Sequence, residues 1–494
     1  VDAVNAGTLD EAILNRSVER LLRINERAQA TTKGGNDLAI DAHHALARKI
    51  AAEGLVLLKN DNDLLPLTGT ETLAVIGQGA LVPAYQGGGS SHINATRVDQ
   101  PLELLRQEAE INFIIGDGHS LEVDSVQIAE AVQVAQSADV ALLFIALPSQ
   151  IESEGYDRRD LNLTPQQVAL IQAVAAVQPR TVVVLNNGSA INMFPWIDAV
   201  PAVLEAWLPG QAGAGAIMDV LFGRVNPSGK LTETFPLALS DTPAYLNFPG
   251  DNGQVRYGEG IFIGYRGYEA TNRPVLFPFG YGLSYTKFAY SNLRVSQTDF
   301  TVDDTLEVSL DLTNTGQRAG KEVVQLYIHD AASRLRRPVK ELKGFAKVAL
   351  EAGETKTVRL TLNSRAFSYY DPAYSRWLAE AGEFEILIGS SSAHIHLHQT
   401  ITMTAGTPLP SRLNPESTLG DWLDDPKGTA MVEPLFQLMV GSTEASGGDK
   451  SLGIDMLTFF RDLPLQVMFS FQGAGLHVDP NELVADMLAQ VRAE

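Results

Sequence analysis

The first half of the chain alternates between continuous apolar runs and segments with helical spacing. The apolar runs, typical of buried strands, are Leu73–Ile76, Asn112–Ile115, Val140–Leu147, Thr181–Leu185 and Ala202–Leu208. The helical patterns lie at Pro101–Gln107, Ser125–Gln136, Pro165–Val177 and Gly213–Leu221. Buried strands separated by helices indicate a mostly parallel sheet covered on both faces. We therefore predict an α/β sandwich domain in this part of the chain.

Two further helices precede this region. The segment Thr8-Leu9-Asp10-Glu11 has the form of a capping box with Thr8 as N-cap, and apolar residues follow it at helical spacing. A second helix is expected over Asp41–Ala52, after the linker-like sequence T-T-K-G-G-N at 31–36. The first helix has no obvious partner of its own in the sequence.

From Leu306 the hydrophobic period changes to two. Alternating apolar positions are Leu306, Val308, Leu310 and Leu312, then Val358, Leu360 and Leu362, and finally Phe384, Ile386 and Ile388. Short alternating strands separated by turn residues are typical of an antiparallel sandwich. We predict an all-β domain of that kind.

After Thr407 the helical pattern returns. It covers Leu419–Leu423, Ala430–Val440, Ile454–Phe469 and Asn481–Val491. Pro464 is expected to break or kink the third of these helices. The apolar content of this tail favours docking on the sandwich or on a partner chain.

Composition narrows the possible functions. The 494 residues carry a formal net charge of -22, which argues against nucleic acid and anionic membrane surfaces and suits a neutral ligand. There is no cysteine, so thiolate chemistry and disulfides are excluded. No run approaches the roughly 18 apolar residues of a membrane helix. Because the chain begins with Val1, we expect a processed or partial product. For its location we expect the periplasm or secretion, with the cytoplasm as the alternative.

The candidate chemistry lies in the loop that follows Val140–Leu147. This loop, 151–165, reads I-E-S-E-G-Y-D-R-R-D-L-N-L-T-P and places Glu152 and Glu154 close to Arg158. Loops that follow buried strands often carry the chemistry of α/β proteins. Nearby arginines favour the ionised carboxylate, whereas a dry cleft favours the protonated form that a catalytic acid needs. An exposed, charged surface loop is the alternative interpretation.

The segment Ser153–Arg158, S-E-G-Y-D-R, resembles the acid/base loop of glycoside hydrolase family 3. The resemblance implies that Glu154 is the general acid/base, with Glu152 the next candidate. Other segments resemble the family in the same order along the chain, namely Trp207–Gln211, Asp219–Leu231, Tyr257–Arg266 and Leu276–Tyr285. We assign the first two of these to the fold, and the two aromatic segments to packing between domains or to a carbohydrate platform.

The resemblance also implies a domain plan. Residues 1–30 would be the terminal helix of a (β/α)8 barrel that this sequence lacks, and 31–290 the α/β sandwich. Residues 291–405 would form a fibronectin type III-like domain, and 406–494 a helical C-terminal extension.

The function implied by the resemblance is that of a retaining β-glucosidase that releases non-reducing-end β-D-glucose from β-glucosides. Retaining chemistry needs two carboxyl groups about 5–5.5 Å apart, a nucleophile and an acid/base. In the family the nucleophile is an Asp of the barrel, and no residue here matches its motif. We therefore expect the nucleophile to come from a separate or missing barrel segment. The alternative is a non-catalytic carbohydrate-binding or interaction module.

Substrate-binding residues are predicted in two places. The Gly-rich segment Tyr85–Ser91 resembles a loop beside the family's sugar pocket, and the hydroxyls of Ser90 and Ser91 could bond sugar hydroxyls. The alternative there is a mobile loop. Tyr156 and Arg158 of the acid/base loop are also predicted to contact the β-glucoside or oligosaccharide substrate. A homodimer is left open.

Cofactor and metal sites are not predicted. The strand-following sequence Gly77-Gln78-Gly79 lacks the third glycine of a dinucleotide-binding motif, since Val82 stands there. The histidines His394, His396 and His398 share one face of a strand, which we interpret as a solvated edge because a metal site needs a closed ligand set.

Overall fold

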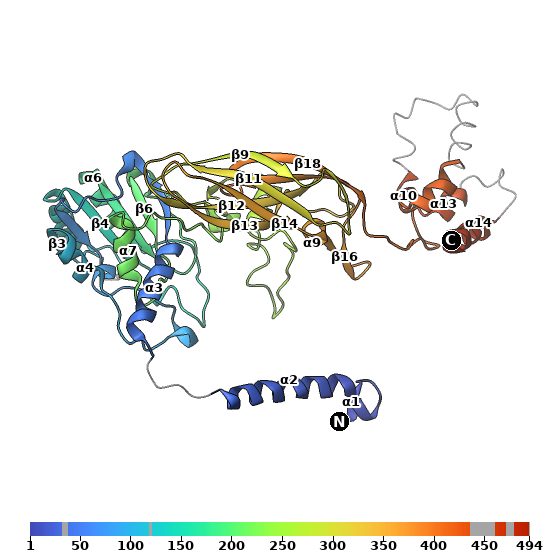
Figure 1. The fold of residues 1–494 in the computed structure, drawn as a ribbon, viewed down its shortest axis with the longest axis horizontal. Helices are drawn as coiled ribbons and strands as arrows, with labels where there is room; N and C mark the ends of the chain where they lie inside the picture. Colours follow the sequence, from blue (N-terminus) through green and yellow to red (C-terminus); the bar gives the residue numbers. More distant parts are fainter. Residues whose placement is uncertain (32–37, 118–120, 435–459, 471–478, 494) are drawn as a thin grey trace. The chain divides into compact units, whose positions relative to one another are not determined.

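The computed structural model describes residues 1–31, 38–117, 121–434, 460–470 and 479–493, and Figure 1 shows the fold. The chain divides into two compact units, Val1–Ala405 and Gly406–Glu494. Unit 1 holds an α/β domain followed by an antiparallel sandwich, and unit 2 is helical. No helix in the described ranges is long and apolar enough to cross a membrane.

The α/β domain is built on a six-stranded sheet with the order β1-β6-β5-β4-β2-β3. Its strands are β1 (Val56–Asn60), β2 (Leu73–Ile76), β3 (Ile111–Ile114), β4 (Val140–Ala146), β5 (Thr181–Asn186) and β6 (Ala202–Glu205). All neighbouring strands are parallel except β1, which pairs antiparallel with β6. The mostly parallel sheet is therefore confirmed, with one antiparallel strand at its edge.

Helices cover both faces of this sheet (Figure 1). One face carries α3 (Ile40–Gly54), α4 (Pro101–Glu108) and α7 (Gly213–Leu221), and the other carries α5 (Ser125–Gln136) and α6 (Pro165–Val177). Alternate residues of the central strands enter opposite cores, which is why β2 and β4 are apolar throughout. Helix α6 begins where predicted, because Thr164 forms a capping box with Gln167 and proline occupies the first helical position.

Strand β6 is shorter than the apolar run that predicted it. The run continues to Leu208, but the strand ends at Glu205. Trp207 has a φ of 55°, a left-handed conformation that lies outside the range of a regular strand. The chain therefore leaves the sheet although its hydrophobic pattern continues.

The predicted cap of the first long helix is wrong. Helix α2 (Glu11–Ala30) is capped by Asp10, whose carboxylate accepts a hydrogen bond from the Ala12 N–H. Thr8 instead donates its hydroxyl to the Ala3 carbonyl, because a separate short helix, α1 (Asp2–Asn5), precedes it. No residue of α2 is buried.

The predicted antiparallel sandwich is confirmed, except that the short strand β10 pairs parallel with β18. One sheet has the order β10-β18-β17-β12-β13 and the other β14-β11-β9. The strands are β9 (Phe288–Val295), β10 (Asp299–Thr301), β11 (Leu306–Asn314), β12 (Gly320–Asp330), β13 (Glu341–Leu350), β14 (Thr355–Leu362), β17 (Gly382–Gly389) and β18 (Ile395–Ala405). The alternating apolar residues of β11, β12 and β17 form the core between the sheets.

Aromatic residues join the two domains of unit 1. Tyr265 of α8 (Tyr265–Ala270) stacks on Phe279 at 4.8 Å and meets Tyr327 of β12 edge-on at 6.0 Å. The Tyr265 hydroxyl also accepts a hydrogen bond from the Leu342 N–H of β13. These contacts confirm interdomain packing for part of the aromatic segments, whereas Tyr257 is 82% exposed.

Unit 2 contains α10 (Leu419–Asp424), a helical stretch at 426–434, α13 (Leu465–Ser470) and α14 (Pro480–Ala493). Much of the predicted helices Ala430–Val440 and Ile454–Phe469 lies outside the described residues. Pro464 stands directly before α13, so it separates this helix from what precedes it, as expected. The apolar side chains of the unit, among them Trp422, Met468 and Leu488, pack on one another in a core of their own.

Candidate functional site

A pocket of about 690 Å³ lies at the carboxyl ends of the parallel strands. Leu147 after β4, Asn186 at the end of β5 and Leu208 after β6 form part of its wall. The rest comes from the glycine-rich loop 82–92, from the loop that follows β4, and from Gly188 and Ser189 after β5. This is the edge of an α/β sheet at which ligands usually bind, and we call this space the Glu154 pocket.

Glu154 lines this pocket with an exposed carboxylate. Its Oε2 accepts the backbone N–H of Ser90, and its Oε1 accepts the Ser90 hydroxyl at 2.8 Å. These two hydrogen bonds lower the pKa of Glu154 by stabilising the ionised form. Among the described residues no lysine or arginine pairs with this carboxylate, so Ser90 alone sets its preference for the charged state.

The glycines of the loop make this contact possible. Gly89 has a φ of 68°, and a Cβ there would lie 2.1 Å from Glu154 Oε2. A Cβ on Gly88 would lie 2.3 Å from the Ser153 hydroxyl. The two loops therefore approach as closely as they do because neither glycine carries a side chain.

Glu152 has a different role from Glu154. Its Oε2 accepts the Gly188 N–H at 2.7 Å, and its Oε1 accepts the Ser189 hydroxyl at 3.1 Å. Both oxygens are thus occupied by the loop that follows β5. Glu152 joins two loops and its side chain is only 20% exposed, whereas Glu154 accepts from Ser90 with both oxygens but is exposed to solvent.

The structure brings together only some of the predicted substrate-binding residues. Ser90 and Ser91 line the Glu154 pocket, although the Ser91 hydroxyl donates to the Gly88 carbonyl. Tyr156 and Arg158 line a different pocket, of about 560 Å³. Their assignment as sugar ligands beside Glu154 stays a prediction.

Arg158 points into its own domain. Its Nη1 donates to the Ser189 hydroxyl at 2.8 Å and to the Ala190 carbonyl at 3.1 Å. Nε and Nη2 are buried without a hydrogen-bond partner in the described part of the chain. Burial lowers the pKa of Arg158, and Glu152 and other carboxylates oppose that shift.

A buried acid, Glu205, was not singled out from the sequence. It ends β6 and accepts the Trp207 N–H at 2.9 Å and the Asn187 side chain at 3.2 Å. Burial raises the pKa of Glu205 to about 8, and the nearby carboxylates Glu233 and Glu152 act in the same direction. The sequence could have indicated this buried acid, because Glu205 is the one charged residue in the apolar run Ala202–Leu208.

Gly77 and the three histidines of the 394–398 segment have structural explanations. A Cβ on Gly77 would lie 2.2 Å from the Phe144 carbonyl oxygen, so this glycine serves the close packing of its loop on β4. His394, His396 and His398 are exposed, as expected, and His396 stacks on Tyr290 at 4.2 Å.

Comparison with known proteins identifies the family. Residues 55–285 match the glycosyl hydrolase family 3 C-terminal domain, and residues 322–392 match a fibronectin type III-like domain. The thermostable beta-glucosidase B of Acetivibrio thermocellus is 45% identical over 497 residues, covering 99% of this chain and 65% of that protein. The chain belongs to glycoside hydrolase family 3. The α/β sandwich and the fibronectin type III-like fold inferred from the family resemblance are thereby confirmed.

Proteins similar to this chain differ in their described activities. An exo-alpha-(1->6)-L-arabinopyranosidase of Bifidobacterium longum is 40% identical over 96% of this chain and 63% of its own length. The crystal structure of a family 3 beta-glucosidase of Bifidobacterium adolescentis superimposes with a TM-score of 0.80 at 40% identity, covering 87% of this chain and 63% of that one. The chain thus spans less than two thirds of the length of these relatives.

Proposed function

We propose that this chain supplies the general acid/base of a retaining β-glucosidase, and that Glu154 is that residue. The observation that carries the proposal is the exposed carboxylate of Glu154, presented into a pocket at the carboxyl edge of the sheet. The nucleophile would come from the barrel that family members carry. The 45% identical relative is described as a beta-glucosidase, which favours β-glucosides over the arabinopyranosides of the 40% identical one.

The contacts of Glu154 suit the second half of such a reaction. A general base that activates water must be ionised, and the donors of Ser90 favour that form. The first half needs a proton on the same carboxyl, because the departing glycosidic oxygen must be protonated. A sugar that displaces Ser90 and excludes water would raise the pKa of Glu154 and supply that condition. In this proposal Ser90 holds the resting carboxylate and yields it to the substrate.

The test is Glu154→Ala in the protein that also carries the barrel. Cellobiose has a basic leaving group, so its turnover should fall by about 10²–10⁴-fold. The dinitrophenolate of a dinitrophenyl glucoside leaves without being protonated, so the first step should still occur. The covalent glucosyl-enzyme should then accumulate, because the variant lacks the base that activates water for its hydrolysis. Azide needs no deprotonation and should restore turnover, giving β-glucosyl azide.

Two outcomes would contradict this proposal. Equal losses on both substrates without azide rescue would remove the acid/base role from Glu154. Turnover of an aryl glucoside by a verified 494-residue chain alone would show that the nucleophile lies within this sequence. Circular dichroism spectra of each variant would check that it is still folded.

A further inference from the structure

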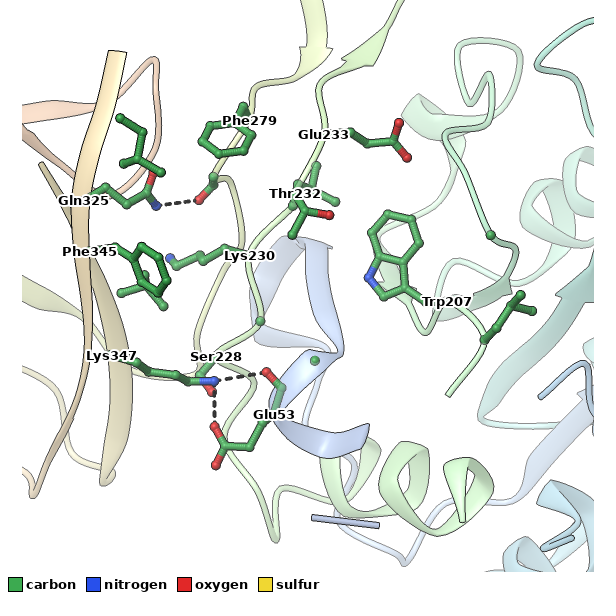
Figure 2. A pocket seen from close by; sticks show the side chains of 18 residues that line it. Glu53, Trp207, Ser228, Lys230, Thr232, Glu233, Phe279, Gln325, Phe345 and Lys347 are labelled. Carbon is green, nitrogen blue, oxygen red and sulfur yellow. Dashed lines mark hydrogen bonds and ion pairs between the residues drawn. The ribbon is translucent and has the colours of Figure 1, made fainter. Parts of the chain in front are cut away.

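A second pocket, of about 680 Å³, lies between the α/β domain and the fibronectin type III-like sandwich (Figure 2). The α/β domain contributes Trp207, Thr232 and Glu233, and the strands β12 and β13 contribute Gln325 and Phe345. Its volume is typical of small-molecule sites. Glu154 does not line it, so the function proposed above makes no use of this space.

Polar contacts between the domains fix the two walls. Lys347 of β13 pairs with Glu53 at 2.6 Å, and Lys230 pairs with Glu322 of β12 at 2.9 Å. The Gln325 side chain donates to the Gly280 carbonyl at 3.0 Å. Lys230 and Glu322 are both nearly buried, at 11% and 8% side-chain exposure. The pocket is therefore formed before any ligand arrives, which reduces the entropic cost of binding.

Trp207, which lines this pocket, has an unfavourable backbone conformation. Its left-handed φ of 55° is unfavourable for a residue with a large side chain. Two hydrogen bonds hold it, one from its N–H to Glu205 at 2.9 Å and one from Asn186 to its carbonyl at 3.0 Å. Backbone strain of this kind gathers at ligand sites. On the opposite wall Phe345 is 66% exposed, an unusual state for an aromatic residue in a strand.

The lining suits a sugar. Aromatic rings pack against the C–H face of a pyranose, and Thr232 and Glu233 can exchange hydrogen bonds with its hydroxyls. The net charge of -22 disfavours an anionic ligand. Gly188 and Leu208 line both this pocket and the Glu154 pocket, so the two spaces share a wall.

We propose that the interdomain pocket is a second carbohydrate-binding site for a neutral oligosaccharide. Trp207 and Phe345 are its stacking surfaces, and Thr232 and Glu233 are its hydroxyl partners. Binding here does not depend on catalysis by Glu154. A family 3 chain with this site would hold an oligosaccharide at the junction of its two domains as well as beside its acid/base loop.

The test is a titration of the 494-residue chain, labelled with 5-fluorotryptophan, with cellotriose. The chain has four tryptophans, so the fluorine spectrum is simple, and Trp207→Phe assigns the signal of interest. We expect the Trp207 resonance to shift at millimolar cellotriose. Phe345→Ala should weaken binding by about tenfold, on the order of one lost aromatic contact. Phe194→Ala is the matched control, because Phe194 is also 66% exposed but lies outside the pocket.

The same titration separates the alternatives. Glu154→Gln should leave the Trp207 shift intact, and loss of the shift in that variant would place the sugar in the Glu154 pocket instead. Binding of p-nitrophenol without binding of cellotriose would overturn the carbohydrate assignment in favour of an apolar ligand. An unshifted Trp207 resonance, or equal affinities for Phe345→Ala and Phe194→Ala, would also overturn it.

Discussion

At the residue scale, Ser90 decides which form of Glu154 is favoured. Its N–H and hydroxyl both donate to the carboxylate, and each donor stabilises the charge. Because Glu154 is otherwise exposed, solvent alone would leave its pKa near that of a free side chain. The neighbouring Ser91 is the natural comparison, since its hydroxyl bonds the Gly88 carbonyl and not Glu154.

Ser90→Ala should raise the pKa of Glu154, because one of the two donors is lost while the backbone N–H remains. The measurement is a carbon NMR titration of the glutamate side-chain carboxyls, with Glu154→Gln to assign the resonance. Ser91→Ala should leave the titration of Glu154 unchanged. If Ser90→Ala and Ser91→Ala titrate alike, the Ser90 hydroxyl does not govern the carboxylate.

The sequence located Glu154 on a loop after a buried strand, and the structure places it there. Its surroundings could not be predicted in the same way. Ser90 is 64 residues away in the chain, and its contact depends on the backbone conformation of Gly88 and Gly89. The contacts of Arg158 could not be predicted either, because its guanidinium donates to Ser189 and Ala190, which are more than 30 residues away in the chain.

At the scale of elements, the helices and strands of the α/β domain followed their sequence signals closely. Helical apolar spacing and N-terminal signals such as Asp124 before α5 and Pro165 in α6 act locally, so α5, α6 and α7 begin and end where their patterns do. The direction of β1 could not be predicted, because a short apolar run such as Leu55–Leu58 has the same pattern in a parallel or an antiparallel strand. The end of β6 was also missed, because the left-handed turn at Trp207 depends on two hydrogen bonds: the Trp207 N–H donates to Glu205, and the Asn186 side chain donates to the Trp207 carbonyl.

Glu205 makes the stability of this sheet edge dependent on pH. Its pKa rises from 4.5 to about 8 on folding, so the folded state binds more protons than the unfolded state between those values. The free energy of unfolding is therefore not reduced by Glu205 below pH 4.5, where this acid is protonated in both states. It falls as the pH rises from 4.5 toward 8, because the buried carboxyl opposes ionisation. A single such group gives a slope of at most about 1.4 kcal/mol per pH unit.

Glu205→Gln should therefore flatten the fall in stability between pH 5 and pH 8 and raise the stability of β5 and β6 at pH 8. Glutamine is neutral and keeps an acceptor for the Trp207 N–H. Denaturant midpoints for these strands, obtained by pulsed hydrogen exchange and mass spectrometry, would measure the effect. Glu383→Gln, at an exposed position of β17, is the control. A slope as steep in Glu205→Gln as in the native chain would contradict the role of this acid.

At the scale of the whole molecule, contacts between residues far apart in the chain join the two domains of unit 1. The sequence indicated two domains and an aromatic segment between them, but it gave no sign of which charges meet. Glu53 at the end of α3 accepts Lys321 of β12, 268 residues away, and Lys347 of β13 at 2.6 Å. Such pairs follow from how the domains dock, and no local pattern encodes them.

Glu53→Gln should loosen this junction. Burial opposes ionisation of Glu53, but hydrogen bonds from the two lysines outweigh it and lower its pKa. The stabilisation is therefore present at neutral pH and is lost as the pH falls below 4.5 and through the lowered pKa of the folded state. For a partly buried pair we expect a loss on the order of 1 kcal/mol, which is about fivefold faster hydrogen exchange in α3 and β13. The control is Glu307→Gln, which removes an exposed pair with Arg359 within one sheet. Equal exchange in both variants would show that Tyr265, Phe279 and their aromatic contacts hold the junction without help from Glu53.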